Sequence, residues 1–155
     1  MTSSARNQRG ILDTSAVILL SRLDDPSLLP AEPMITAVTL AELTVGPLVA
    51  TSDGERAARQ AHLQQAESDF DPLPFDAAAA RAFGQVAASL RMSGRKTTAR
   101  SYDAMNAAIA LATGLPLYTC NPADFSGIPG LDVVVLRPSP GTERAAAPRC
   151  PSFHK

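Results

Sequence analysis

Four acidic residues of this chain stand where a carboxylate is unexpected, because each interrupts or borders an apolar segment. They are Asp13 after the apolar residues 10–12, Glu42 within the apolar segment 38–43, Asp103 before an alanine-rich segment, and Asp124 just after residues 117–120. A buried carboxylate is costly unless it is paired or bound to a metal. Oxygen ligands from distant segments are typical of sites for Mg²⁺, with Mn²⁺ as a possible substitute. Such a site can activate a water molecule and stabilise charge on a phosphodiester.

Three of these acids also have an ordinary structural explanation. Asp13 and Asp124 could each cap a short helix, and Asp103 could interact with the helix dipole near the start of a helix. Glu42 has no capping role, because it lies in the middle of a predicted helix among apolar residues. It is therefore the strongest single indication of a functional site.

The elements that must position these acids alternate along the chain. Strands are predicted over residues 10–13, 34–36, 72–75, 117–120 and 133–136. Helices are predicted over residues 15–23, from a cap at Thr39 to Gly46-Pro47, over 54–70, from a cap at Asp76 to about Met92, and over 99–113. This alternation predicts an α/β fold with a parallel sheet covered on both faces. Ligands of such folds bind at the carboxyl ends of the strands, where Asp13 and Asp124 are predicted to lie.

The bulk properties indicate a single domain. The 155 residues can bury enough apolar surface to fold alone, and a net charge of −1 excludes a simple polycation that coats nucleic acid. Residues 1–9 are predicted to be a flexible N-terminus, 10–137 the domain, and 138–155 a disordered proline-rich tail. Neither a signal peptide nor a membrane span is expected, and we expect a cytoplasmic protein. Cys120 and Cys150 have no spacing typical of a zinc site.

A basic segment leads directly into Asp103. No acid occurs between residues 77 and 102, whereas five basic side chains do: Arg81, Arg91, Arg95, Lys96 and Arg100. Such a run is often a solvated loop. Its place beside Asp103 makes Arg95, Lys96 and Arg100 candidates for contact with phosphate groups.

The sequence resembles the PIN-domain ribonucleases, and in its short single-domain form the VapC toxins of bacterial toxin–antitoxin pairs. Four motifs within residues 10–137 carry the resemblance: Ile11-Leu12-Asp13-Thr14-Ser15, Ala41-Glu42-Leu43 with Gly46, Asp103 with Ala107-Ala108-Ile109-Ala110, and Thr119-Cys120-Asn121-Pro122-Ala123-Asp124-Phe125. Each motif is weak alone, but four in order are fairly specific. The resemblance implies a three-layer α/β/α sandwich around a central parallel sheet of about five strands. It also implies a Mg²⁺-dependent endoribonuclease that uses a metal-activated water, dimerises and is inhibited by a cognate antitoxin.

The resemblance also implies roles for individual residues. Asp13, Glu42, Asp103 and Asp124 match the acidic quartet that holds the metal and carries catalysis. Thr14 and Thr119 are accessory residues able to hydrogen-bond carboxylates or metal-bound water, and RNA contact is assigned to Arg95, Lys96 and Arg100. The chain departs from the family pattern at two positions. Cys120 replaces a usual Arg, and Asn106 replaces an aliphatic residue one turn after Asp103, where it could add a polar ligand or contact RNA.

Two other functions remain compatible with the sequence. A PIN-like module could bind RNA or a protein without cutting, although an intact quartet argues against this. A metal-dependent phosphatase could use Asp13 as a nucleophile, but that chemistry usually has a second acid two residues later, where this chain has Ser15.

Overall fold

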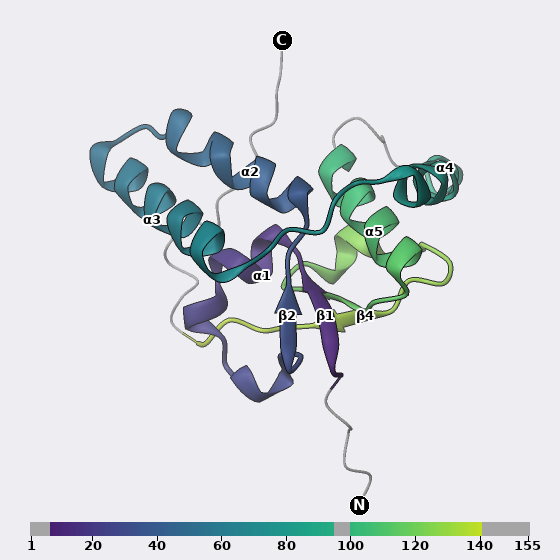
Figure 1. The fold of residues 1–155 in the computed structure, drawn as a ribbon, viewed down its shortest axis with the longest axis horizontal. Helices are drawn as coiled ribbons and strands as arrows, with labels where there is room; N and C mark the ends of the chain where they lie inside the picture. Colours follow the sequence, from purple (N-terminus) through teal and green to yellow (C-terminus); the bar gives the residue numbers. More distant parts are fainter. Residues whose placement is uncertain (1–6, 95–99, 141–155) are drawn as a thin grey trace, which may run out of the picture.

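A four-stranded parallel sheet forms the centre of the molecule (Figure 1). The structure is a computed structural model that describes residues 7–94 and 100–140. The strands are β1 (Arg9–Leu12), β2 (Glu32–Met34), β3 (Leu117–Thr119) and β4 (Val133–Val135), in the order β2-β1-β3-β4. The strand predicted over residues 72–75 is reduced to a single bridge between Leu73 and Thr36. Pro72 and Pro74 lack the N–H groups that a longer ladder would need.

Within the described residues, five α-helices and several 3₁₀ turns surround the sheet. The helices are α1 (Thr14–Ile18), α2 (Ala37–Leu48), α3 (Asp53–Asp69), α4 (Ala77–Met92) and α5 (Ser101–Thr113). The 3₁₀ turns include η1 (Leu20–Arg22), η2 (Pro26–Leu28) and η4 (Pro122–Phe125). The helix predicted over residues 15–23 is thus divided into α1 and η1. Within the described part of the chain, no helix is both long and apolar enough to cross a membrane.

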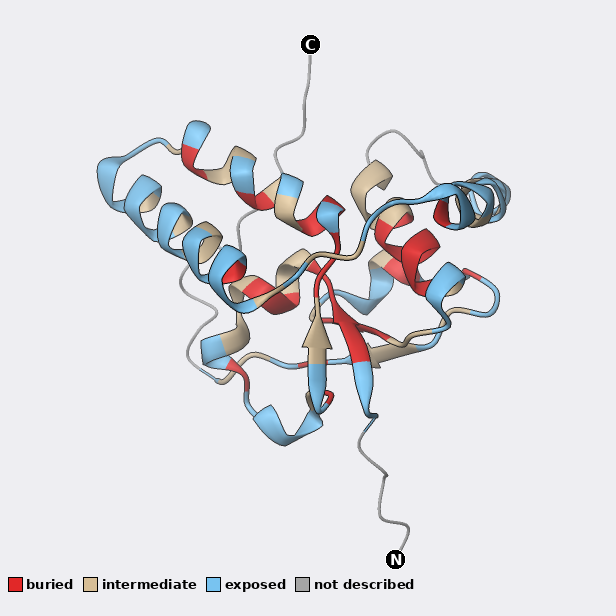
Figure 2. Ribbon diagram, in the orientation of Figure 1, coloured by how far each residue is buried: buried red, intermediate tan, exposed pale blue. Residues whose placement is uncertain are grey.

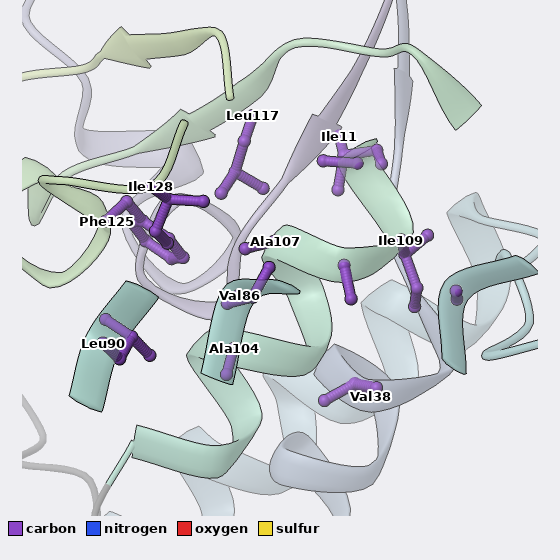
Figure 3. Packing of buried hydrophobic residues seen from close by; sticks show 13 residues of the cluster. Ile11, Val38, Val86, Leu90, Ala104, Ala107, Ile109, Leu117, Phe125 and Ile128 are labelled. Atoms are coloured by element: carbon purple, nitrogen blue, oxygen red, sulfur yellow. The ribbon is translucent and has the colours of Figure 1, made fainter. Parts of the chain in front are cut away.

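The strands separate two apolar clusters, which gives the three-layer α/β/α sandwich that the resemblance implies. Ile11 and Leu117 face the cluster that α4 and α5 cover, together with Phe125 (Figure 3). Leu12 and Tyr118, the next residues along the same strands, face the other cluster, which includes residues of α1 and α3. Alternate residues of a strand point to opposite faces, so one pair of short strands supplies both cores. Figure 2 shows buried residues concentrated on β1 and on the inward sides of α2 and α5, whereas most of α3 is exposed.

Helix α2 carries Glu42, and its start differs from the sequence prediction. Its N-cap is Thr36, whose hydroxyl accepts a 3.0 Å hydrogen bond from the Thr39 backbone N–H. The predicted cap at Thr39 was wrong, because β2 ends at Met34 and leaves room for the helix to begin one turn earlier. The helix continues through Pro47 to Leu48. Val38 packs in the α4/α5 cluster and Leu43 in the α1/α3 cluster, so α2 contacts both layers.

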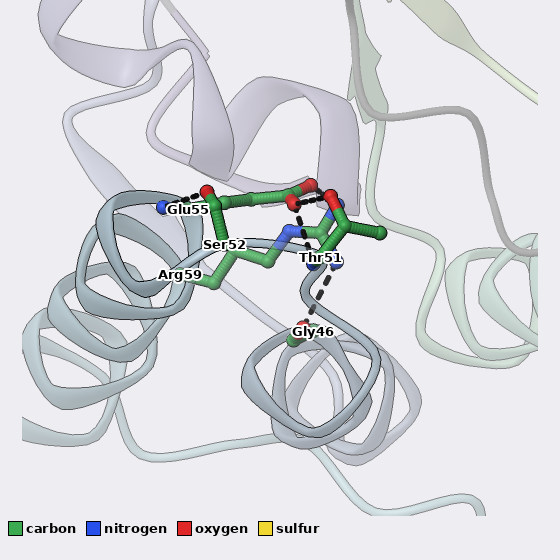
Figure 4. Close-up of polar contacts among 5 residues, drawn as sticks. All are labelled: Gly46, Thr51, Ser52, Glu55 and Arg59. Carbon is green, nitrogen blue, oxygen red and sulfur yellow. Dashed lines mark hydrogen bonds and ion pairs between the residues drawn. The ribbon is translucent and has the colours of Figure 1, made fainter.

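Hydrogen bonds and an ion pair connect helix α3 and the segment before it to the end of α2 (Figure 4). The Arg59 guanidinium donates a 2.9 Å hydrogen bond to the Gly46 carbonyl, one of the last-turn carbonyls of α2, and it also pairs with Glu55. Glu55 accepts hydrogen bonds from both the N–H and the hydroxyl of Thr51, each of 2.8 Å. A Cβ at Gly46 would lie 3.3 Å from the Arg59 Cδ, so glycine permits this close approach.

The boundaries of α4 and α5 follow the predicted signals closely. The Asp76 side chain caps α4 by accepting a hydrogen bond from the Ala79 N–H, as predicted. Helix α5 ends at Gly114, whose φ of 68° is in the left-handed region that favours glycine.

At both ends the structured domain extends beyond residues 10–137. The Ala31 and Glu32 N–H groups donate to the carbonyls of Asn7 and Gln8, which the sequence assigned to the flexible N-terminus. The Ser139 N–H, assigned to the tail, donates to the Arg22 carbonyl. Residues 1–6 and 141–155 of these two segments lie outside the described residues.

Candidate active site

The candidate site lies where the chain changes direction across the sheet. From β1 the chain first adds β2 on one side and later β3 on the other, so the switch point is between β1 and β3. Ligands of open α/β sheets bind outside the carboxyl ends of the strands at such a point. Asp13 directly follows β1, and Asp124 lies in η4, shortly after β3. Glu42 on α2 and Asp103 in the first turn of α5 complete the predicted quartet.

Asp13 is a buried carboxylate, only 4% exposed, with three hydrogen-bond donors. Its Oδ1 accepts from the Ser15 hydroxyl at 2.6 Å and from the Ala16 N–H at 2.9 Å, and its Oδ2 accepts from the Thr119 hydroxyl at 2.5 Å. Burial raises the pKa of Asp13, these hydrogen bonds oppose the rise, and the Asp124 charge adds to it. Asp13 is also the N-cap of α1, so the structural reading and the functional reading both apply to it.

Glu42 is half-buried, and its orientation depends on the residue after Asp13. The Thr14 hydroxyl donates a 2.8 Å hydrogen bond to the Glu42 Oε1. Thr14 and Thr119 therefore each hydrogen-bond an acid of the quartet, the carboxylate contact that the sequence suggested for both.

Asp103 experiences the charges of all three other acids. Its pKa is raised to about 7, first by burial and then by the negative charges of Asp124, Glu42 and Asp13, while the Arg100 charge opposes the rise. Coulombic effects of this kind act over short distances in a partly buried site. Four carboxylates from four separate segments are thus electrostatically coupled.

Asp124 forms an ion pair with Arg100, the N-cap residue of α5. The Arg100 Nη1 lies 2.7 Å from the Asp124 Oδ1, and about a third of each side chain is exposed. This pair places one of the three predicted RNA-binding cations next to the quartet. The other two, Arg95 and Lys96, lie outside the described residues.

The residues fit a hard divalent cation by donor chemistry, although their side chains do not form a compact ligand cluster. Over residues 7–94 and 100–140, no three Asp, Glu, His or Cys side chains are grouped closely enough to hold a metal ion as they stand. Thr14 holds Glu42 and Arg100 holds Asp124. The other three carboxylates nevertheless raise the pKa of Asp103, and a bound cation would neutralise that repulsion. Their all-oxygen chemistry suits Mg²⁺ or Mn²⁺.

The two departures from the family pattern are explained by their surroundings. Burial and the Asp13 charge raise the pKa of the Cys120 thiol to about 11, so this position contributes no charge where the family has a cation. Asn106 is completely buried and hydrogen-bonds Thr36 and Thr39. The expectation that Asn106 could contact RNA is therefore wrong. Helix α2 covers the side of α5 that carries Asn106, so the Asn106 side chain does not reach solvent.

Sequence reasoning missed two residues that support the acids. The Ser15 hydroxyl donates to Asp13 and accepts a 3.1 Å hydrogen bond from the Cys120 N–H, which links the ends of β1 and β3. Thr39 is buried beneath Glu42. The sequence feature that could have identified Thr39 is its spacing of three residues from Glu42. This spacing places both residues on one face of the helix.

Comparison with known proteins identifies the family to which this chain belongs. The family model described as "PIN domain" matches residues 11–131. The chain is 39% identical to Ribonuclease VapC5 of Mycobacterium tuberculosis over 78% of this chain and 88% of that protein. It is 31% identical to Ribonuclease VapC4 of the same organism over 83% of this chain and 98% of that protein. The chain therefore belongs to the PIN-domain family, among the relatives named VapC.

The fold agrees with solved structures of this family. The crystal structure of VapBC-5 from Mycobacterium tuberculosis, a member of the VapBC family of toxin–antitoxin systems, contains a chain that superposes with a TM-score of 0.71. That chain is 35% identical in sequence, and the match covers 83% of this chain and 98% of that one. The PIN-like sandwich expected from the sequence is confirmed.

Proposed function

We propose that this protein is a metal-dependent endoribonuclease and the toxin of a toxin–antitoxin pair. The observation that carries the proposal is the coupling of Asp103 to Asp13, Glu42 and Asp124 at the switch point of the sheet. The similarity to proteins named ribonucleases supports the choice of RNA as substrate. We expect both the substrate and the partner in the cytoplasm.

The metal in this proposal is Mg²⁺, with Mn²⁺ as a substitute, held by Asp13, Asp103 and Asp124 with Glu42. When bound, such a cation lowers the pKa of a water molecule and neutralises charge that develops on a phosphodiester. The protein's own contribution is to orient the carboxylates. Three donors hold Asp13 and Thr14 holds one oxygen of Glu42, so two of the four proposed ligands have defined orientations before a cation binds.

The cationic side of the site is proposed to hold the RNA backbone. Arg100 lies beside Asp124 and carries a charge that can contact a phosphate. Arg95 and Lys96, nearby in sequence, extend the same basic segment. Because Cys120 contributes no positive charge, we propose that RNA binding relies on this segment more than it does in relatives with Arg at that position.

The proposed protein partners are a cognate antitoxin and a second copy of this chain. The antitoxin is proposed from the similarity to a VapBC toxin–antitoxin structure, which covers nearly the whole length of the matching chain there. The homodimer rests on the resemblance to the VapC toxins.

The proposal is tested by RNA cleavage with the purified protein and by growth of bacteria that express it without an antitoxin. We expect cleavage in Mg²⁺ or Mn²⁺, loss of cleavage in excess EDTA, and growth arrest. Glu42→Gln keeps the shape of the side chain but removes its charge, so it should abolish cleavage and restore growth while the fold is retained. Glu67→Gln, the same change at an exposed position of α3, is the matched control and should behave as wild type.

Other results would identify a different function. RNA that is bound but stays intact with both metals would favour the non-catalytic binding module. Transfer of a phosphate label to Asp13 would favour the phosphatase. Equal toxicity of wild type and folded Glu42→Gln would contradict catalysis by the quartet.

A further inference from the structure

A buried polar contact joins α2 and α5 beneath the acids that these helices carry. Thr36, Thr39 and Asn106 are each completely buried. The Thr36 hydroxyl donates to the Asn106 Oδ1 at 2.5 Å, and the Asn106 Nδ2 lies 3.3 Å from the Thr39 Oγ1, to which it donates. A buried amide is destabilising unless its polar atoms find partners. The two helices therefore have a strongly preferred relative position.

This contact lies one helical turn from two members of the quartet. Thr39 precedes Glu42 by three residues on α2, and Asn106 follows Asp103 by three residues on α5. Residues three apart share one face of a helix. The bond between Asn106 and Thr39 therefore joins α2 and α5 one helical turn from Glu42 and Asp103, and the Glu42 charge acts on Asp103.

The contact continues as a chain of hydroxyl groups to the Glu42 carboxylate. The Thr14 Oγ1 lies 2.8 Å from the Glu42 Oε1 and 3.3 Å from the Thr39 Oγ1. A hydroxyl has one hydrogen, and the nearer, charged oxygen of Glu42 takes that of Thr14. The longer contact with Thr39, in which Thr14 is again the donor, is therefore the weaker of the two. The Thr39 oxygen thus accepts from both the Asn106 amide and the Thr14 hydroxyl, and Thr14 connects it to the Glu42 carboxylate.

We propose that Asn106 is a positioning residue, which acts through Thr39 and Thr14 to fix the Glu42 carboxylate opposite Asp103 for metal binding. This inference rests on the proposed function. The competing explanation is that Asn106 only stabilises the packing of α2 on α5. In that case its loss would lower stability without a specific effect on Glu42.

A double-mutant cycle on metal affinity separates these explanations. Mn²⁺ binding is measured by calorimetry for wild type, Asn106→Leu, Glu42→Gln and the double variant. We expect Asn106→Leu to weaken Mn²⁺ binding about tenfold, the size of effect seen when a residue that orients a metal ligand is removed. In the Glu42→Gln background the same substitution should have little effect, because the group it orients is already changed. Equal weakening in both backgrounds, or no weakening, would overturn the proposal.

Two further comparisons control for stability and folding. Val86→Ala removes buried apolar volume from α4, so it should lower the melting temperature but leave Mn²⁺ affinity unchanged. Should Asn106→Leu fail to fold, Thr39 offers a second test. Thr39→Val removes the hydroxyl at similar volume and should weaken Mn²⁺ binding, whereas Thr39→Ser keeps it and should restore affinity. Equal affinities of the two Thr39 variants would contradict a role for the Thr39 hydroxyl in positioning Glu42.

Crystal structures decide the positioning role independently of the proposed function. If wild type does not bind Mn²⁺, the metal-dependent function fails, but the geometry can still be compared. The hydrogen bond between Thr14 and Glu42 should be present in wild type and lost in Asn106→Leu. The same bond and the same Glu42 conformation in both structures would show that Asn106 does not position this side chain.

Discussion

The Thr119 hydroxyl donates a 2.5 Å hydrogen bond to the Asp13 Oδ2, although 106 positions separate the two residues in sequence. The contact follows from the pairing of the two central strands. Leu12 of β1 is in register with Tyr118 of β3, and the Asp13 N–H donates to the Tyr118 carbonyl. The next residues along the two strands are Asp13 and Thr119. The sheet register therefore supplies the buried carboxylate with a donor.

Replacing Thr119 by Val should destabilise the protein most where Asp13 is charged. The variant keeps the side-chain volume but removes a donor to a buried carboxylate, a loss of about 1–3 kcal/mol. The pKa of Asp13 should rise further, so the lost stability should be larger at about pH 8 than at about pH 3, below the usual pKa of this carboxyl group. Thermal unfolding at both pH values tests this. Thr119→Ser should retain most of the stability, and Thr44→Val, at an exposed position of α2, should show no such pH dependence.

Asp103→Asn should stabilise the metal-free protein at neutral and higher pH. The folded chain holds the Asp103 proton up to a pKa of about 7, whereas the usual value is 3.8. Stability from this group is therefore fully present below the usual value and is lost as pH rises through about 7. The melting temperature of Asp103→Asn minus that of wild type should grow from near zero at about pH 4 to a plateau above about pH 8. A difference independent of pH would contradict the raised pKa of Asp103.

A divalent cation should raise the melting temperature of the wild-type protein. Binding to the folded state alone stabilises by about 2.7 kcal/mol at a cation concentration of 100 times Kd. For a chain of this length, each kcal/mol of added stability raises the melting temperature by about 2–4 °C. Asp103→Asn combined with Asp124→Asn should abolish the rise, because the pair removes two proposed ligands while Asp13 keeps its capping role.

The matched control for this experiment changes two acids outside the site. Asp69→Asn with Asp71→Asn alters the net charge equally, at exposed positions at the end of α3 and just after it. This control should respond to Mg²⁺ and Mn²⁺ as wild type does. A full response of the Asp103/Asp124 variant would place the metal elsewhere.

Arg100→Gln should weaken RNA binding more than it affects stability. The Arg100–Asp124 pair is about one-third exposed, so solvent screening limits its contribution to stability to less than about 1 kcal/mol. If Arg100 contacts a phosphate of single-stranded RNA, the salt dependence of binding should flatten by a slope of about 0.7. Steady-state kinetics should then show a higher KM with a smaller change in kcat. Arg81→Gln, at an exposed position of α4, is the control, and an Arg100→Gln variant with wild-type affinity and salt slope would exclude the contact.

Local signals in the sequence predicted many of the element boundaries. The cap at Asp76 and the end of the last helix at Thr113 depend only on neighbouring residues, and both predictions are confirmed. Thr36 and Thr39 could not be distinguished as caps of α2, because both are suitable hydroxyl residues ahead of the same apolar pattern. The position at which β2 leaves the sheet decided between them, and that depends on its pairing with β1.

The burial of Asn106 is a second feature that could not be predicted from the sequence. Helical periodicity correctly placed Asn106 on the same face as Asp103. The sequence did not contain the information that α2 would cover that face one turn below Asp103, so solvent exposure was expected where the structure has burial. Which helix covers a given face is decided by packing among distant segments.

The sequence by itself determined the four acids, their order along the chain and the elements that carry them, because residue type and local periodicity are read directly from it. Only the tertiary structure decided which groups support each acid. Thr119 and Ser15 support Asp13, and Thr14 supports Glu42. These contacts depend on strand register and on the packing of α2 against α5, and both arise from interactions between residues far apart in sequence.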